Sequence, residues 1–163
     1  GLEYATSNRG GCHVRGYMIS PEVLGLPVKM DPLVTEGKAS MLKTFQDLTS
    51  LVDATGICLF TTFGIGLPEV AAQYREAVGS DESDEEILLK GERIWNLEKQ
   101  FNIAAGVEKD ALPPRLLREK LPSGPAAGKV NDLYTMLAEY YAARGWTAEG
   151  IPTPEKLEQL HLK

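Results

Sequence analysis

The chain has 163 residues, of which 43% are hydrophobic and 25% charged, values typical of a folded globular protein. Its formal net charge of -6 argues against a nucleic-acid-binding protein, because phosphate recognition normally requires a basic surface. No apolar run approaches the roughly 20 residues that span a bilayer, and the N-terminus lacks the pattern of a signal peptide. We therefore expect a cytoplasmic protein of one domain, or of two small helical subdomains, that contacts neither nucleic acid nor membrane.

The first 37 residues have the composition of loops. Three glycines fall within residues 10–16, and three prolines follow within residues 20–37. Glycine lets the backbone turn sharply, and proline disfavours helix in the residue before it. We predict irregular structure over 1–20 and extended or loop structure over 20–37, with room for one short turn.

Apolar periodicity predicts helices from residue 38 onward. The first covers 38–55 and stops at Gly56, and the second covers 67–78 with a proline in its first turn. Residues 57–64 between them fit a short strand, with a continued helix as the alternative. Ser83 and Glu86 form a capping box that opens a long helix to about Phe101. Its predicted apolar face consists of Ile87, Leu88, Ile94, Leu97 and Phe101, with Trp95 beside it.

The C-terminal part continues this helical pattern after a proline-rich stretch. Residues 105–129 hold four prolines, with one or two helical turns predicted at "PPRLLREKL". Residues 131–145 form a clear helix that Asn131 caps and Gly145 ends, and Thr153 caps a short final helix. Because strands and helices do not alternate, the pattern predicts an all-α fold with long Pro/Gly-rich loops.

The stretch "LVDATGICLF", residues 51–60, places an acid and a thiol around a helix end. Asp53 lies in the last helical turn, where the helix dipole disfavours a carboxylate by up to about 1 kcal/mol. Solvent, a nearby cation or the N–H groups of a ligand would offset this. Cys58 is either a thiol that only packs or a metal ligand. With Cys12 as the only other cysteine, the chain cannot complete a four-thiolate cluster alone.

His13 lies in the glycine-rich loop between Arg9 and Arg15. It can act as a hydrogen-bond donor or general acid–base group, or simply bind a backbone carbonyl. Pairing with Cys12 is not expected, because adjacent residues of an extended loop point apart. The loop "NRGGCHVRG" fits neither the dinucleotide fingerprint nor the phosphate-binding P-loop. From these residues alone, a helical binding module and a thiol enzyme using Cys12 or Cys58 both stay open.

Five segments together resemble, in order, the C-terminal part of the tungsten-dependent aldehyde ferredoxin oxidoreductase family. They are "YATSNRGGCHVRGY", "LVDATGICLF", "GERIWNLEKQFNIAAG", "LPPRLLREKLPSGPAAGKV" and "MLAEYYAARGWTAEGIPTPEKLEQL". The most specific element is D-x-x-G-x-C, here Asp53, Gly56 and Cys58, with isoleucine before the cysteine where the family commonly has leucine. The resemblance covers nearly the whole chain. It implies a multihelical C-terminal region, with 1–37 as a glycine/proline-rich segment on the cofactor side and 38–163 as a helical bundle.

Family members oxidise aldehydes to carboxylic acids at a tungsten bis-pterin cofactor and pass electrons through a [4Fe-4S] cluster to ferredoxin. The resemblance implies that Asp53 accepts hydrogen bonds from a pterin and that Gly56 lets the backbone approach it. Cys58 would be the fourth thiolate of the cluster. His13 would lie by the metal and the aldehyde and donate a hydrogen bond or proton. Molybdenum is the alternative to tungsten.

Other family ligands are absent from this sequence: the second pterin-binding acid, three cluster cysteines and the iron ligands that bridge a dimer. We therefore expect an inactive fragment that holds neither tungsten nor a stable cluster by itself. Its partner would be the remainder of the same polypeptide, with its N-terminal pterin-binding domain, and the full-length enzyme could form a homodimer. The alternative is a stand-alone helical binding or interaction module without catalysis.

Overall fold

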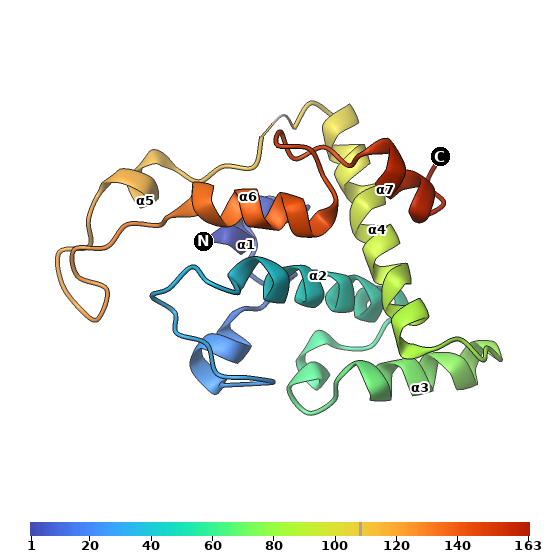
Figure 1. The fold of residues 1–163 in the computed structure, drawn as a ribbon. Coiled ribbons are helices and arrows are strands. Elements are labelled where there is room, and N and C mark those ends of the chain that lie inside the picture. The colour runs from blue at the N-terminus through green and yellow to red at the C-terminus, as the bar shows by residue number, and fades with distance from the viewer. Residues whose placement is uncertain (108) are drawn as a thin grey trace.

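The computed structural model describes residues 1–107 and 109–163, which form an all-α fold (Figure 1). The elements are α1 (Leu2–Thr6), a π-helical turn η1 (Ser20–Leu24), α2 (Lys38–Thr55), a 3-10 helix η2 (Leu59–Phe63), α3 (Leu67–Val78), α4 (Asp84–Ala104), α5 (Pro114–Arg118), α6 (Leu133–Arg144) and α7 (Pro154–Gln159). Within the described ranges, the only strand-like pairing is an isolated antiparallel bridge between Trp146 and Pro152. The predicted all-α class is confirmed. No helix in the described ranges has both the length and the apolar character to cross a membrane.

Helix α2 occupies the centre of the molecule and contacts α1, α3, α4 and α6 (Figure 1). Helix α6 runs beside it, and α4 crosses it closely. At this crossing, a Cβ on Gly91 of α4 would lie 1.9 Å from the backbone oxygen of Asp47 in α2. Only glycine permits this approach, and it does so although glycine costs roughly 1 kcal/mol inside a helix.

Two hydrophobic clusters share α2 and α4. The smaller lies between the C-terminal half of α2, α3 and the start of α4. Its buried members are Leu51, Val52, Val70, Ala71 and Ile87. The larger joins α1, α2, α4 and α6, with buried members Leu2, Ala39, Leu42, Trp95, Leu112, Leu133, Met136, Leu137, Tyr140, Tyr141 and Trp146. Because α2 and α4 contribute to both clusters, displacing either helix would disturb both.

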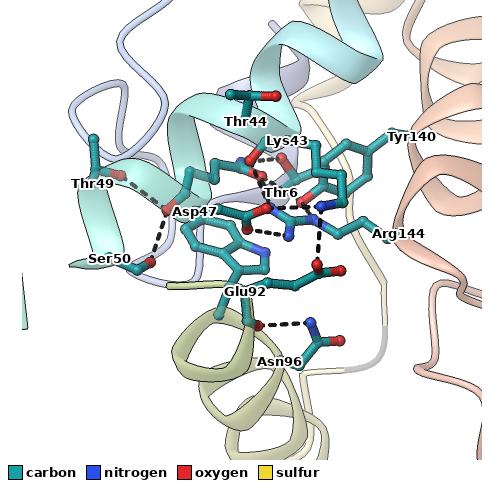
Figure 2. A network of polar contacts seen from close by, with 12 residues as sticks. Thr6, Lys43, Thr44, Asp47, Thr49, Ser50, Glu92, Asn96, Tyr140 and Arg144 are labelled. Atoms are coloured by element: carbon teal, nitrogen blue, oxygen red, sulfur yellow. Dashed lines mark hydrogen bonds and ion pairs between the residues drawn. The ribbon is translucent and has the colours of Figure 1, made fainter. Parts of the chain in front are cut away.

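A polar network fills the space between α2, α4 and α6 (Figure 2). Its centre is the Arg144 guanidinium, which is fully buried and forms an ion pair with the Asp47 carboxylate. Arg144 also donates to Gln46 Oε1 at 2.8 Å and to the Tyr140 hydroxyl at 3.0 Å. The guanidinium lies 5.2–5.9 Å from the centres of three aromatic rings, those of Trp95, Tyr140 and Trp146. Cation–π contacts of this kind strengthen when water is excluded.

Two lysines extend the network toward the C-terminal helix. Lys43 binds Asp47 at 2.8 Å and Glu92 at 3.2 Å, and Lys156 binds Glu92 at 3.2 Å (Figure 2 shows the Lys43 and Glu92 side chains). Burial alone would raise the pKa of Glu92, but the two ammonium groups outweigh it and the pKa is lowered. This carboxylate therefore stays charged and ties α2 and α4 to α7.

The N-terminal segment, predicted to be irregular, instead begins with the short helix α1. Its buried side carries Glu3 and Thr6, and Gln46 Nε2 donates to both, at 2.7 Å to Glu3 Oε2 and 3.1 Å to Thr6 Oγ1. A helix this short is unstable alone, so these contacts stabilise it. Burial raises the pKa of Glu3 to about 7, although the Gln46 hydrogen bond and the nearby Arg15 charge oppose the shift.

Helices predicted over 38–55 and 67–78 are confirmed, as is the capping box, in which Glu86 N donates to Ser83 Oγ at 3.2 Å. Residues 57–64 are neither strand nor continued helix, because left-handed Gly56 ends α2 and η2 follows. Helix α6 starts after Asp132 rather than Asn131.

The predicted apolar face of α4 was wrong at its C-terminal end. Leu97 is 56% exposed and Phe101 is 72% exposed. The buried face there instead carries Asn96 and Lys99. Asn96 Oδ1 accepts from Trp146 Nε1 at 2.8 Å, and Lys99 binds Asp110 at 2.9 Å, so satisfied polar groups replaced apolar ones.

We predict that Asp47→Asn lowers the free energy of unfolding by about 3–5 kcal/mol, because it leaves the Arg144 charge buried without its carboxylate partner. Urea unfolding followed by circular dichroism measures the change. The matched control is Glu119→Gln, since Glu119 and its partner Arg115 are 65% and 81% exposed. It should change stability by less than about 1 kcal/mol. Equal effects of the two variants would contradict the prediction.

We predict that Glu3→Gln flattens the pH dependence of stability between pH 5 and 8. The folded-state pKa of Glu3 is raised from 4.5 to about 7, so the folded protein holds this proton more tightly. Stability is therefore full below the unfolded-state pKa and falls as pH rises through 7, by about 3 kcal/mol. The variant should match wild type near pH 4 and exceed it at pH 8. Unfolding curves at both pH values measure the stability of the two proteins. A variant whose stability equals that of wild type at pH 8 as well as at pH 4 would contradict the prediction.

Candidate functional site

The glycine-rich loop of residues 7–15 lies against the C-terminal end of α2 and the second half of α4. Arg15, which is 4% exposed, anchors it by donating from Nη2 to Ser50 Oγ and to Glu98 Oε2, each at 2.8 Å. The Arg15 guanidinium also lies 5.3 Å from the centre of the Trp95 ring. Asn8 adds a hydrogen bond from Nδ2 to the backbone oxygen of Trp95 at 3.1 Å. The loop therefore has a defined position relative to both helices.

Asp53 lies in the last turn of α2 and meets two cations from this loop. Arg9 Nη2 and Arg15 Nη1 bind the same oxygen, Oδ2, at 3.2 Å and 3.1 Å. The unfavourable interaction of the Asp53 carboxylate with the helix dipole is therefore offset by two cations of the chain itself. The Asp53 side chain is 34% exposed, and neither arginine uses Oδ1. This second oxygen can accept hydrogen bonds from a bound group.

A cavity of about 430 Å³ opens beside these groups, between the loop and α4. Its lining includes Leu97 and Phe101, which are exposed apolar residues of α4. It also includes the charged residues Arg9 and Arg15. The remaining lining residues are Asn8, Glu98 and Asn102. Within residues 1–107 and 109–163, the buried Arg15 Nε has no hydrogen-bond partner. The cavity combines charged donors with an apolar surface.

Gly56 and Cys58 come shortly after Asp53 in the sequence. Gly56 has φ of +75°, and a Cβ there would meet no atom within 4 Å, so backbone conformation rather than space favours glycine. Cys58 has extended backbone just before η2, and its thiol is free and exposed. The described residues contain no group of three or more His, Cys, Asp or Glu side chains that could hold a metal ion. The Cys58 thiol therefore belongs to no such group among the residues that the structure describes.

His13 is exposed and is hydrogen-bonded to Tyr4, with 3.2 Å between His13 Nδ1 and Tyr4 Oη. It does not pair with Cys12, whose Sγ instead accepts from the Val14 N–H at 3.3 Å. Its ring also lies 6.3 Å from the ring of Tyr17, which in turn contacts the ring of Phe63 in η2 at 5.2 Å. Through these rings, the His13 loop reaches the segment that follows Cys58.

The structure brings the predicted residues to one loop-and-helix-end region but does not join them all. Arg9 and Arg15 connect the loop of His13 to Asp53, whereas His13 itself bonds to Tyr4. The sequence did not assign roles to Arg15, Glu98 or Tyr4. The unfavourable position of Asp53 was a signal that could have identified Arg9 and Arg15. For Tyr4, no signal existed, because its helix was not predicted.

We predict that Arg15→Lys lowers the free energy of unfolding by about 1–3 kcal/mol. A single ammonium cannot reproduce the fork of bonds to Ser50, Asp53 and Glu98 or the contact with the Trp95 ring. Arg9→Lys is the matched control, because Arg9 binds the same Asp53 oxygen but its side chain is 52% exposed. It should change stability by under about 0.5 kcal/mol in the same urea titration. A loss in Arg9→Lys as large as in Arg15→Lys would refute this.

A family described as "aldehyde ferredoxin oxidoreductase, domains 2 & 3" matches residues 1–162. The chain is 52% identical over 167 residues to the tungsten-containing aldehyde ferredoxin oxidoreductase of Pyrococcus abyssi, and all of it is covered. It is 52% identical over 166 residues to the enzyme of the same name from Pyrococcus furiosus and 51% identical to that of Thermococcus kodakarensis, with 99% covered in each case. Spanning 27–28% of these relatives, in their C-terminal part, the chain belongs to the aldehyde ferredoxin oxidoreductase family.

Proposed function

We propose that this chain is the C-terminal part of an enzyme that oxidises aldehydes to carboxylic acids at a tungsten bis-pterin centre. Electrons would leave through a [4Fe-4S] cluster to ferredoxin. The observation that carries the proposal is the arrangement at the end of α2. This segment contains, in sequence order, the partly exposed Asp53 carboxylate, Gly56 in the left-handed conformation and the exposed Cys58 thiol. The relatives, which are called tungsten-containing, favour tungsten over molybdenum.

The residues present fit these groups. Asp53 Oδ1 would accept from the N–H edge of a pterin, while Arg9 and Arg15 hold Oδ2 and fix the carboxylate. Cys58 would supply one cluster thiolate, because a free, exposed thiol needs no rearrangement to become a ligand. When bound, the metal–pterin centre supplies the oxidation chemistry and the cluster carries the electrons. The protein supplies position, hydrogen bonds and exclusion of water.

His13 would donate a hydrogen bond or proton to the oxygen of the aldehyde or of the acid formed from it. Its exposed ring and its place on the loop that reaches Asp53 through Arg9 and Arg15 support this role. Both directions of proton transfer are open to imidazole near neutral pH. The cytoplasmic location stays a prediction.

The N-terminal part of the same polypeptide is the proposed partner. Seven large apolar side chains between residues 19 and 34 are 42–66% exposed. A single segment of a monomeric protein rarely exposes this many large apolar side chains. They are Ile19, Val23, Leu24, Leu26, Val28, Leu33 and Val34. Covering them with the preceding part of the polypeptide would remove this apolar surface from water and complete the cofactor site.

We predict that Cys58→Ser in the complete polypeptide, assembled with iron, loses most of the cluster iron and its visible absorption. Cys12→Ser is the matched control and should retain both, because Cys12 is engaged with the Val14 N–H. The chain of 163 residues alone should bind no stoichiometric iron, since it offers too few ligands. Iron analysis and absorption spectra test all three proteins. Full cluster iron in Cys58→Ser, or stoichiometric iron in the isolated chain, would overturn the assignment.

A further inference from the structure

We propose that Tyr4 is a positioning residue for His13, an inference that rests on the proposed function of His13. In the described part of the chain, the His13 ring makes its one hydrogen bond through Nδ1, with Tyr4 Oη at 3.2 Å. The two ring centroids are 5.8 Å apart. Because a phenolic hydroxyl is a better donor than acceptor, Tyr4 Oη is assigned as the donor to Nδ1, which places the proton of the neutral imidazole on Nε2. His13 therefore presents an Nε2–H donor to the reaction.

The chemistry of imidazole makes this bond decisive for what His13 can do. A neutral ring carries one N–H, and the nitrogen that accepts a hydrogen bond cannot carry that proton. The phenolic O–H is a donor well suited to a ring nitrogen, and its pairing with Nδ1 selects the Nε2–H form. Without Tyr4, both forms are open to His13, and only part of the population would present the donor on Nε2.

Tyr4 is anchored to the core even though its own ring is 44% exposed. Its neighbours in α1, Glu3 and Thr6, are 5% and 2% exposed, and both accept hydrogen bonds from the fully buried Gln46. Gln46 in turn accepts from Arg144 at 2.8 Å. The helix that carries Tyr4 is therefore held by the central network of the fold, which limits where the Tyr4 hydroxyl can lie.

A second tyrosine, Tyr17, also lies near the imidazole, and it bonds to the His13 backbone rather than to the ring nitrogens. Tyr17 N donates to the His13 backbone oxygen at 3.1 Å, and its ring centroid lies 6.3 Å from that of His13. Tyr17 has φ of +26°, which non-glycine residues rarely adopt and which occurs at sites where position matters. Both tyrosines thus lie near His13, and among the described residues only the hydroxyl of Tyr4 bonds to its ring.

Nuclear magnetic resonance of the 15N-labelled chain of 163 residues tests the bond directly. The sequence has only two histidines, so His161 serves as the internal reference in two-bond 1H–15N spectra that distinguish the ring forms. Wild type and Tyr17→Phe should show His13 as the Nε2–H form, whereas Tyr4→Phe should show a mixture with Nδ1–H. Both variants keep their rings, so the comparison isolates one hydroxyl. An unchanged His13 pattern in Tyr4→Phe, or an equal change in Tyr17→Phe, would overturn the inference.

Kinetics of the complete, cofactor-loaded enzyme test whether the bond between Tyr4 and His13 affects turnover. Tyr4→Phe should lower kcat about three- to tenfold, with KM changed less, because a bond of this strength orients His13 for the reaction. Tyr134→Phe, altered at a tyrosine of α6 that is 70% exposed, should keep wild-type kcat. Wild-type kcat in Tyr4→Phe would sink the positioning role. Wild-type kcat in His13→Asn would instead sink the proposed role of His13, and the ring-form spectra separate these two failures.

Discussion

The structure depends on one buried cation. Arg144 has no exposed surface, and a guanidinium in that position that is not neutralised and hydrogen-bonded costs the folded state several kcal/mol of stability, about 3–5 kcal/mol for a broken buried pair. Asp47 neutralises it, Gln46 and Tyr140 bind its N–H groups, and Trp95 and Trp146 place ring faces against it. These partners come from α2, α4, α6 and the turn after α6. Neutralising this one buried charge therefore determines how α2, α4 and α6 pack against one another.

The same network reaches the candidate site by two routes. Through Gln46 it holds α1, and hence Tyr4 and the ring of His13. Through Trp95, whose ring also lies 5.3 Å from the Arg15 guanidinium, it adjoins the group that binds Asp53. His13 and Asp53, for which we propose roles toward the substrate and the cofactor, are thus supported from a common centre. Rigid support of this kind is what placing reacting groups requires.

Much of the helical framework was predictable, because its signals are local. Helix α2 ends at Gly56, α3 begins with a proline in its first turn, and Ser83 and Glu86 cap α4 as their spacing indicates. The burial pattern was predicted less well. Leu97 and Phe101 have the right spacing for a core face, yet both are exposed. Periodicity shows that a helix is amphipathic, but not which side its neighbours cover or where a polar network replaces apolar packing.

For the site, the sequence by itself determined the types of group available: an acid at a helix end, a left-handed glycine, a second thiol and a loop histidine. It also carried the family resemblance that the comparisons confirmed. Only the tertiary structure decided that Arg9 and Arg15 share one oxygen of Asp53, and that Tyr4 meets His13. The Asp53 contacts join residues 38 and 44 positions apart. Such pairings follow from how α1, α2 and α4 pack, which no local pattern encodes.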